Sequence, residues 1–209
     1  MKLSSFVALI GSLAINGFNT FHQPAVAEQL PPARHIAEAL SPADVSHSKT
    51  DGLTIAKIGQ KYGYKDANGK LVIPARFNNC YDFFEGLAAV EINGEWGYID
   101  RSGEMVIPAQ FDRAGSFDGG LALVQLDEKW GYIDRQGEIA VTPIFEEAET
   151  FSEGLAKVKV GEKWGYINRR GTLVIAPIFD EVDSFHNDRA WIRIDKKVGY
   201  IDRTGKFLQ

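Results

Sequence analysis

The sequence repeats with a period of 34 residues from Gly52 to its end, and this period constrains the fold more than any other feature. A Gly-Tyr pair recurs in every copy, at 63–64, 97–98, 131–132, 165–166 and 199–200. The residue before it is Trp96, Trp130 or Trp164 in the central copies, and Tyr62 or Val198 in the outer ones. Because these residues recur every 34 positions without an insertion, the sequence predicts tandem copies of one structural unit. The copies are 52–85, 86–119, 120–153, 154–187 and a partial fifth copy, 188–209.

Each copy predicts three short β-strands. In the second copy, apolar residues alternate along Gly86–Ile92, which is typical of a strand with one buried face. Trp96–Asp100 is rich in strand-forming residues, and Met105–Ile107 is an apolar run that Pro108 is expected to end. We expect a loop from Phe111 to Phe117 to lead into the next copy.

The glycine between Trp and Tyr needs a reason, because glycine weakens the interior of a strand. We expect another backbone or an aromatic ring to lie against it, and we favour a ring. The tryptophans recur at fixed register, so we interpret them as core residues rather than as a sugar-stacking surface. For Trp130→Ala this predicts a loss of about 3–5 kcal/mol.

A 34-residue meander cannot bury its apolar face alone, so consecutive copies must stack. The sequence therefore predicts an all-β fold in which tandem three-stranded meanders form an open curved array. The outer copies are atypical, as caps require: Lys65 replaces an isoleucine, and Asp188-Arg189 replaces Gly-Leu. The alternative is a closed, five-bladed propeller-like ring, which suits a second strand that is apolar on both faces.

Two segments, Lys129–Asp134 and Lys163–Asn168, show the repeat most clearly, as Lys-Trp-Gly-Tyr-Ile-Asp/Asn. With the Gly-Leu-Ala-x-Val before it and the Val-Ile-Pro-x-x-Phe-Asp after it, the unit resembles the bacterial WG-repeat (KWG) family from Gly52 to Gln209. This resemblance implies an all-β repeat module that occurs beside varied partners. It supplies no catalytic motif.

Residues 1–27 read as a signal peptide. Lys2 precedes an apolar run from Phe6 to Ile15, and Ala25-Val26-Ala27 forms a cleavage site. The run is shorter than the roughly 20 residues that span a bilayer, so we expect cleavage and no membrane insertion afterwards. The protein is expected to be exported, to the periplasm or the medium. Residues 28–51, with Pro31-Pro32, read as a linker or leader.

The expected mature chain has 22 basic and 28 acidic residues, a net charge of −6. This balance argues against nucleic acid as a partner, because nucleic acid binding favours clustered Lys and Arg. Cys80 is the single cysteine, so no intramolecular disulfide can form.

The candidate binding residues lie in the fifth copy. Trp191 stands where the other copies have Ile55, Ala89, Leu123 and Lys157, and Arg189 and Arg193 are expected on the same strand face. A binding role and a capping role both remain open for this face. Which surface binds, and the oligomeric state, are left open by the sequence.

No catalytic or metal site is expected, and no cofactor. The recurring Asp66, Asp100, Asp134, Asn168 and Asp202 could form a calcium ladder, but one acid per copy does not supply converging ligands. We interpret them as turn formers, and the arginines at 101, 135, 169 and 203 as partners of these acids or of solvent. The histidines His35, His47 and His186 have no metal-ligand spacing.

These features favour an exported, non-catalytic module that binds a protein at or outside the cell envelope. A module that binds cell-wall or extracellular glycan is the alternative. A hydrolase is the third hypothesis, and it is disfavoured because every loop obeys the repeat, which leaves little room for a unique site.

Overall fold

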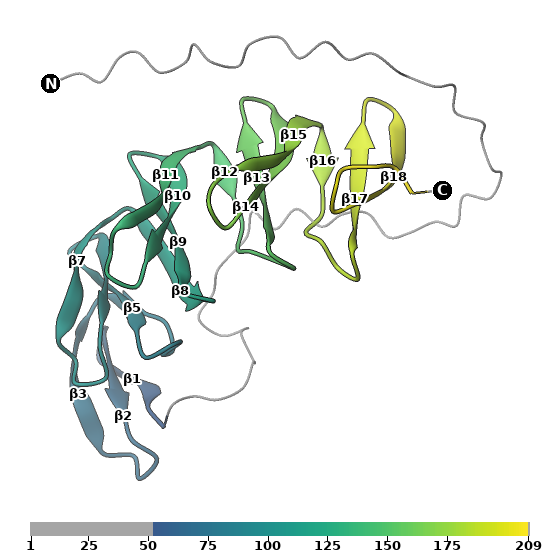
Figure 1. Ribbon diagram of the computed structural model, residues 1–209. Coiled ribbons are helices and arrows are strands. Elements are labelled where there is room, and N and C mark those ends of the chain that lie inside the picture. The colour runs from purple at the N-terminus through teal and green to yellow at the C-terminus, as the bar shows by residue number, and fades with distance from the viewer. Residues whose placement is uncertain (1–51, 209) are drawn as a thin grey trace, which may run out of the picture. The chain divides into compact units, whose positions relative to one another are not determined.

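The computed structural model describes residues 52–208, in which every regular element is a β-strand and the strands form five antiparallel sheets (Figure 1). The first sheet contains β1 (Thr54–Ile58), β2 (Lys61–Lys65) and β3 (Leu71–Phe77). The second contains β4 (Asn79–Cys80), β5 (Ala88–Ile92), β6 (Glu95–Ile99) and β7 (Met105–Phe111). The third contains β8 (Arg113–Asp118), β9 (Leu121–Leu126), β10 (Lys129–Asp134) and β11 (Ile139–Phe145).

The fourth sheet contains β12 (Glu147–Ala148), β13 (Leu155–Val160), β14 (Lys163–Asn168) and β15 (Leu173–Phe179). The fifth contains β16 (Glu181–Val182), β17 (Arg189–Ile194) and β18 (Lys197–Asp202). Each sheet is built on the strands of one copy, and the first strand of the second to fifth sheets is supplied by the end of the preceding copy. The signal peptide and the leader predicted for 1–27 and 28–51 lie outside the described residues.

The connection between copies is more regular than the sequence predicts. The loop expected from Phe111 to Phe117 contains β8, which pairs with β9. The shorter β4, β12 and β16 do the same in other copies, so the central sheets have four strands where three were expected. The reason is that a chain passing along the edge of the next sheet satisfies that edge's backbone groups, as Asp112 does by donating its N–H to the Gln125 carbonyl.

Strand three does not end at its proline, which corrects the expectation for Pro108. β7 continues to Phe111, because the ladder contains a bulge. Trp96 pairs with Phe111 and Tyr98 with Ile107, so the register shifts between these two pairs. Pro108 lies within the shift, where its missing N–H breaks no ladder bond.

The bulge also explains the glycine in strand two. A Cβ on Gly97 would lie 2.6 Å from the Ile107 carbonyl oxygen and 2.7 Å from the Ala109 nitrogen, closer than real Cβ atoms approach. The same holds at Gly63, Gly131 and Gly165. The expected aromatic ring is therefore wrong for four copies, where backbone lies against the glycine. Only at Gly199 is the nearest neighbour a ring, that of Phe207.

The core lies between consecutive sheets. We call the side of a sheet that carries the strand-two tyrosine its Tyr face, and the opposite side, which in copies two to five carries the isoleucine after that tyrosine, its Ile face. Tyr166 on the Tyr face of the fourth sheet packs with Ala190, Ile192 and Ile201 on the Ile face of the fifth. Three equivalent clusters join the other neighbouring sheets. Burial is thus shared between copies, as stacked repeats require.

The tyrosines connect each sheet to the next in two ways. The Tyr98 ring lies 4.9 Å from the Phe117 ring, and its hydroxyl donates a 2.8 Å hydrogen bond to the Gly115 carbonyl. The hydroxyls of Tyr64, Tyr132 and Tyr166 likewise donate to the carbonyls of Tyr81, Glu149 and Asp183. These bonds satisfy buried phenols that would otherwise be costly to bury.

The outer copies differ in the way caps do. Ile99, Ile133, Ile167 and Ile201 are at most 1% exposed, whereas Lys65 at this position of the first sheet is exposed. At the other end Val198 is 63% exposed, where Trp96 is 8% exposed. No strand pairing between described residues joins the first sheet to the fifth. The prediction of an all-β fold of stacked repeats in an open array is confirmed.

The tryptophans belong to the core to different degrees. Trp96 is buried and stacks on Tyr81, with ring centroids 5.1 Å apart. Trp130 and Trp164 are partly buried and pack against core clusters. The interpretation of Trp130 as a core residue therefore holds only in part. Residues 52–208 include no helix that could cross a membrane.

Candidate functional site

The three candidate residues of the fifth copy share one face. Arg189, Trp191 and Arg193 alternate along β17, so all three project from the Tyr face of the last sheet. Trp191 is paired in register with Tyr200 of β18, and Arg193 with Val198. The sequence prediction that these side chains lie together is thus met by the geometry.

This face is left open by the stacking order. In the fourth sheet the equivalent Tyr166 is fully buried by the fifth sheet, and Lys157, at the position of Trp191, donates a hydrogen bond to the Val182 carbonyl at 3.4 Å. In the fifth sheet Trp191 and Tyr200 are both only half-buried. The last Tyr face therefore presents two adjacent aromatic side chains with no described sheet stacked on it.

Arg189 places a positive charge at this face, and no acidic side chain among residues 52–208 pairs with it. Its side chain is exposed, and its guanidinium lies 5.1 Å from the centre of the Tyr200 ring. Such a cation–π contact places the guanidinium over the ring without neutralising its charge. Within residues 52–208 the Arg189 side chain makes no ion pair. It is therefore available to a carboxylate.

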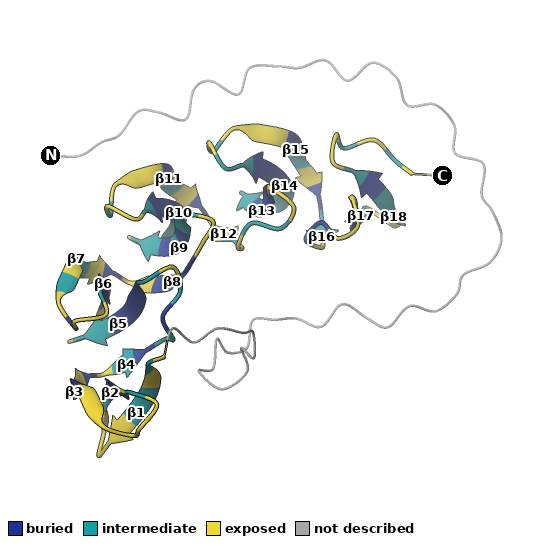
Figure 2. Cartoon of the chain, turned by 60° about the horizontal axis from the view of Figure 1, so that its bottom comes forward, coloured by how far each residue is buried: buried dark blue, intermediate teal, exposed yellow. Residues whose placement is uncertain are grey.

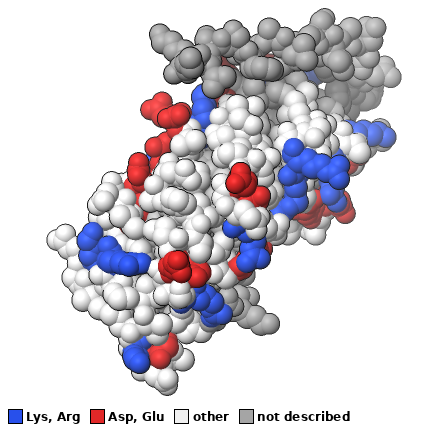
Figure 3. All heavy atoms as spheres, turned by 60° about the vertical axis from the view of Figure 1, so that its left-hand side comes forward, with Lys and Arg blue, Asp and Glu red and all other residues white. Residues whose placement is uncertain are grey.

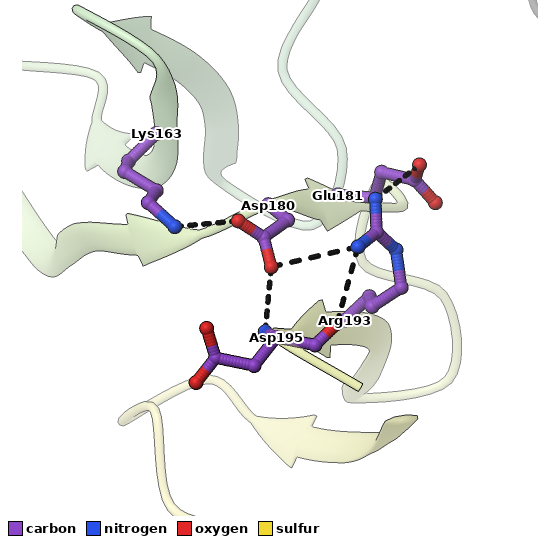
Figure 4. Close-up of polar contacts among 5 residues, drawn as sticks. All are labelled: Lys163, Asp180, Glu181, Arg193 and Asp195. Carbon is purple, nitrogen blue, oxygen red and sulfur yellow. Dashed lines mark hydrogen bonds and ion pairs between the residues drawn. The ribbon is translucent and has the colours of Figure 1, made fainter. Parts of the chain in front are cut away.

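Arg193 is engaged in a network of charges instead (Figure 4). Its guanidinium contacts Glu181 at 2.6 Å and Asp180 at 3.5 Å. Asp180 also accepts hydrogen bonds from the Lys163 ammonium at 2.5 Å and from the Asp195 N–H at 2.6 Å. The hydrogen bond from Lys163 holds the pKa of Asp180 below its usual value, and the bond to Glu181 raises that of Arg193.

A similar network recurs one copy earlier, which shows what it does. Glu146 takes the place of Asp180, accepts from Lys129 at 3.2 Å, and accepts from the Gly161 N–H at 3.1 Å. In both copies the acid ties strand two of one sheet to the hairpin of the next. The network is a joint between copies, so Arg193 serves primarily in stacking and Arg189 and Trp191 remain the candidates for binding.

The recurring aspartates are turn formers, as predicted. Asp100 accepts hydrogen bonds from the N–H groups of Ser102 and Glu104 at 2.9 and 3.0 Å. Asp66, Asp134, Asn168 and Asp202 do the same in their own turns. Among residues 52–208 no three His, Cys, Asp or Glu side chains converge as metal ligands.

Three of the arginines that follow these aspartates, Arg135, Arg169 and Arg203, donate to backbone carbonyls, which corrects their expected pairing with the turn acids or with solvent. Arg135, in the third copy, donates to the carbonyl of Glu85, the last residue of the first copy, at 2.7 Å. Arg169 and Arg203 make equivalent bonds to the carbonyls of Gly119 and Glu153. Each of these arginines directly follows a turn Asp or Asn in the sequence, which suggested a local partner. The actual partner is a carbonyl 50 residues earlier, which sequence spacing does not indicate.

The structure shows no catalytic arrangement among the residues it describes. The Cys80 thiol is buried between the first two sheets, and burial raises its pKa to about 11, so it is a poor nucleophile. The exposed His186 lies in the turn that precedes β17. A shallow groove of about 400 Å³ beside β3 is lined by Pro74, Ser102 and Met105 among others, and Arg76 closes one side by bonding to the Gly103 carbonyl.

Sequence reasoning missed a second exposed surface. The outer strands β3, β7, β11 and β15 carry exposed apolar side chains at the repeat spacing (Figure 2). They are Leu71, Val72, Val106, Ile139, Ile144, Leu173, Val174 and Ile178. The signal was present, since these apolar runs lack the polar alternation of a half-exposed strand. On the face drawn in Figure 3, basic and acidic groups lie in small interspersed clusters with much uncharged surface between them.

The model of the family described as "WG containing repeat" matches residues 62–96, 96–130, 130–164 and 164–197. No curated protein matches the chain. One similar solved structure is PorZ, an essential surface component of the type-IX secretion system of Porphyromonas gingivalis, at 10% identity and a TM-score of 0.41. The match covers 76% of this chain and 25% of PorZ, so the chain spans about a quarter of PorZ's length.

Another is a protein of unknown function from Bacteroides caccae, at 15% identity and a TM-score of 0.35, with 76% of this chain and 77% of that chain covered. Likenesses of this size carry no argument about function. The family match is different in kind, because it covers more than half of the chain and follows its 34-residue period. The chain therefore belongs to the WG repeat family.

Proposed function

We propose that the protein is an exported, non-catalytic binding module that engages a protein partner at the cell envelope or outside the cell. The observation that carries this proposal is the open Tyr face of the last sheet, where Trp191 and Tyr200 are half-buried side by side. Exposed aromatic residues of this kind are enriched at protein interfaces, because they bury a large area at a small cost in conformational entropy.

Export is supported by the sequence of the N-terminus. The apolar run before Ala25-Val26-Ala27 fits a secretory signal, and cleavage after Ala27 would leave a mature chain that starts at Glu28. Intact mass of the exported protein tests this step. A mature product that retains Met1 would contradict it.

A non-catalytic role is supported by the use of the polar groups. The recurring aspartates form turns, and the arginines at 135, 169 and 203 donate to backbone carbonyls 50 residues earlier. The acids at 146 and 180 join neighbouring sheets. Because these recurring polar side chains stabilise turns and joints between sheets, few polar side chains remain that could take part in catalysis. The family match, to a β-repeat without a catalytic motif, agrees with this reading.

A glycan-binding module is the second candidate. It is favoured by one observation, the half-buried indole of Trp191 beside the Tyr200 ring, since sugars stack on aromatic faces. The two candidates differ in the partner class and share the face.

The experiment uses the mature chain, residues 28–209, as bait in an envelope extract, beside a co-sedimentation assay with cell-wall polysaccharide. Trp191→Ala is compared with Val106→Ala, which removes an apolar side chain 44% exposed on the outer strand β7. The proposal predicts a protein that the wild type and Val106→Ala capture and Trp191→Ala does not. The glycan alternative predicts a different result. No protein is captured, the chain co-sediments with polysaccharide even at high salt, and polysaccharide binding quenches the tryptophan fluorescence.

A further inference from the structure

We infer that the partner presents an acidic polypeptide segment to the Tyr face of the last sheet, with carboxylates meeting Arg189 and a backbone carbonyl meeting the Tyr200 hydroxyl. This inference rests on the proposed function and names the chemistry of its partner. Three observations lead to it: the distribution of charge along the copies, the state of the polar groups on the face, and the use of the same tyrosine in the other four copies.

Charge changes sign along the repeat. Copies two and three, residues 86–153, contain four basic and fourteen acidic side chains. The fifth copy, residues 188–209, contains six basic and three acidic side chains, a net charge of +3 in a chain whose net charge is −5. An asymmetry of this kind steers partners of opposite charge to one end of a protein. Both outer copies are basic, and the fifth, the more basic of the two, is the one with the open Tyr face.

The acids near the face are already occupied, whereas Arg189 is not. Asp202 accepts hydrogen bonds from the N–H groups of Thr204 and Lys206 and from the Thr204 hydroxyl. Asp180 is bound to Lys163 and Asp195. Arg189 has only the Tyr200 ring beside it among the described residues. A carboxylate brought to this face therefore meets an available guanidinium, with which it can form a charge-assisted pair.

The Tyr200 hydroxyl points to a polypeptide as the source of that carboxylate. In the first four copies the equivalent hydroxyls all donate to a backbone carbonyl of the next sheet. In the fifth copy no described residue accepts a hydrogen bond from Tyr200. A peptide carbonyl would accept from this hydroxyl as the carbonyls of the next sheet do in the other copies, whereas polygalacturonate, an acidic polysaccharide, contains no amide carbonyl.

A second copy of this chain is a poor occupant. Stacking head to tail would place the Ile face of the first sheet on the open face, and that sheet carries Lys65 where copies two to five bury an isoleucine. The first copy, residues 52–85, has five basic and three acidic side chains, so both ends of the array are positive. Tail-to-tail stacking would bring Arg189 against its own copy. Like charges at an interface disfavour both arrangements.

The test measures binding of a dye-labelled random copolymer of glutamate and tyrosine to the mature chain by fluorescence anisotropy. Copolymer of lysine and tyrosine and labelled polygalacturonate are the comparison probes. Three variants are used: Arg189→Glu, Tyr200→Phe, and the matched control Arg170→Glu, which reverses an exposed charge in a turn of the fourth copy. Circular dichroism establishes that each variant is folded.

The inference predicts that the acidic copolymer binds and that binding weakens with salt. Arg189→Glu should weaken it about tenfold or more, and Tyr200→Phe about threefold, with Arg170→Glu within about twofold of the wild type. If Arg170→Glu weakened copolymer binding as much as Arg189→Glu does, the inference would be overturned. Binding would then depend on the overall charge of the protein and not on the Tyr face of the last sheet. Preference for polygalacturonate with the same dependence on Arg189 would overturn it in favour of a glycan.

Sedimentation velocity of the mature chain alone tests the remaining occupant. A monomer at all concentrations agrees with the inference, and self-association that Trp191→Ala abolishes contradicts it. The inference and the proposed function can fail separately. If the copolymer does not bind but Trp191-dependent capture of an envelope protein persists, the acidic partner is wrong and the binding module stands. If both are lost, both are wrong.

Discussion

The hydroxyl of Tyr166 in β14 donates a 2.6 Å hydrogen bond to the carbonyl oxygen of Asp183, 17 residues later and directly after β16 of the next sheet. The same tyrosine ring lies 4.8 Å from the ring of Phe185. One side chain thus supplies both apolar burial and a polar bond across the joint between two sheets. Because this pair recurs at each joint, it is the feature through which the repeat sequence specifies stacking.

Tyr166→Phe should lower the free energy of unfolding by about 1–2 kcal/mol, because it leaves the Asp183 carbonyl without its partner while keeping the ring. The matched control is Tyr200→Phe, whose hydroxyl lies at the open end and has no acceptor among residues 52–208; this change should cost less than about 0.5 kcal/mol. Urea unfolding measures both. Equal losses would show that the hydroxyl bond does not contribute to the joint.

Gly131→Ala should destabilise the protein by about 3 kcal/mol, since the new Cβ would overlap the backbone of the β11 bulge. That Cβ would lie 2.5 Å from the Val141 carbonyl oxygen and 2.7 Å from the Pro143 nitrogen. Gly199→Ala is the control, where the nearest atom is a Phe207 ring carbon at 3.8 Å. Thermal unfolding of the two variants should differ clearly, and a mild effect at 131 would mean that the bulge can move aside.

Trp96→Ala and Trp130→Ala should differ, although the two residues occupy the same position of the repeat. Trp96 is 8% exposed and stacks on Tyr81, so its loss should cost about 3–5 kcal/mol. Trp130 is only partly buried, and about 2 kcal/mol is expected for it. Urea midpoints provide the comparison. A larger loss at 130 than at 96 would contradict the burial order of the two rings.

High pH should unfold the protein through its buried tyrosines. Burial raises the pKa of Tyr98 and of Tyr166 above the ordinary 10.0, and Tyr64 and Tyr132 behave alike. A group whose pKa is raised by folding stabilises the native state below its unfolded pKa, and that contribution is lost as the pH rises above 10. Phenolate absorbance of these four should therefore appear together with loss of the circular dichroism signal. Full ionisation with an intact signal would contradict their burial.

The strand pattern and the stacking could be predicted from sequence because they depend on local alternation and on the fixed period. Lys65 and Val198 departed from the repeat at the positions that caps require, and both lie exposed at the ends. The reason for the strand-two glycine could not be predicted. It depends on a bulge in strand three. A shift of register between two paired strands cannot be recognised from the residue pattern of either strand alone.

The candidate face could be predicted in part. Alternation along Arg189–Ile194 placed Arg189, Trp191 and Arg193 together, since side chains two apart share a strand face. Their different roles could not be read from the sequence. Arg193 pairs with Asp180 and Glu181, which precede it by more than ten residues, whereas within residues 52–208 the Arg189 guanidinium makes no ion pair and lies over the Tyr200 ring. That distinction depends on tertiary contacts.

In an open array each copy is stabilised only by its immediate neighbours, and no copy depends on contact between the first sheet and the fifth. Hydrogen exchange of a chain ending at Asn187, which lacks β17 and β18, tests this arrangement most directly. We expect β4–β11 to keep their protection and β12–β15, whose Tyr166, Ile175 and Phe179 lose their cover, to exchange faster. Loss of protection throughout β1–β15 would contradict the open array, because it would mean that the last copy closes a ring on which every other copy depends.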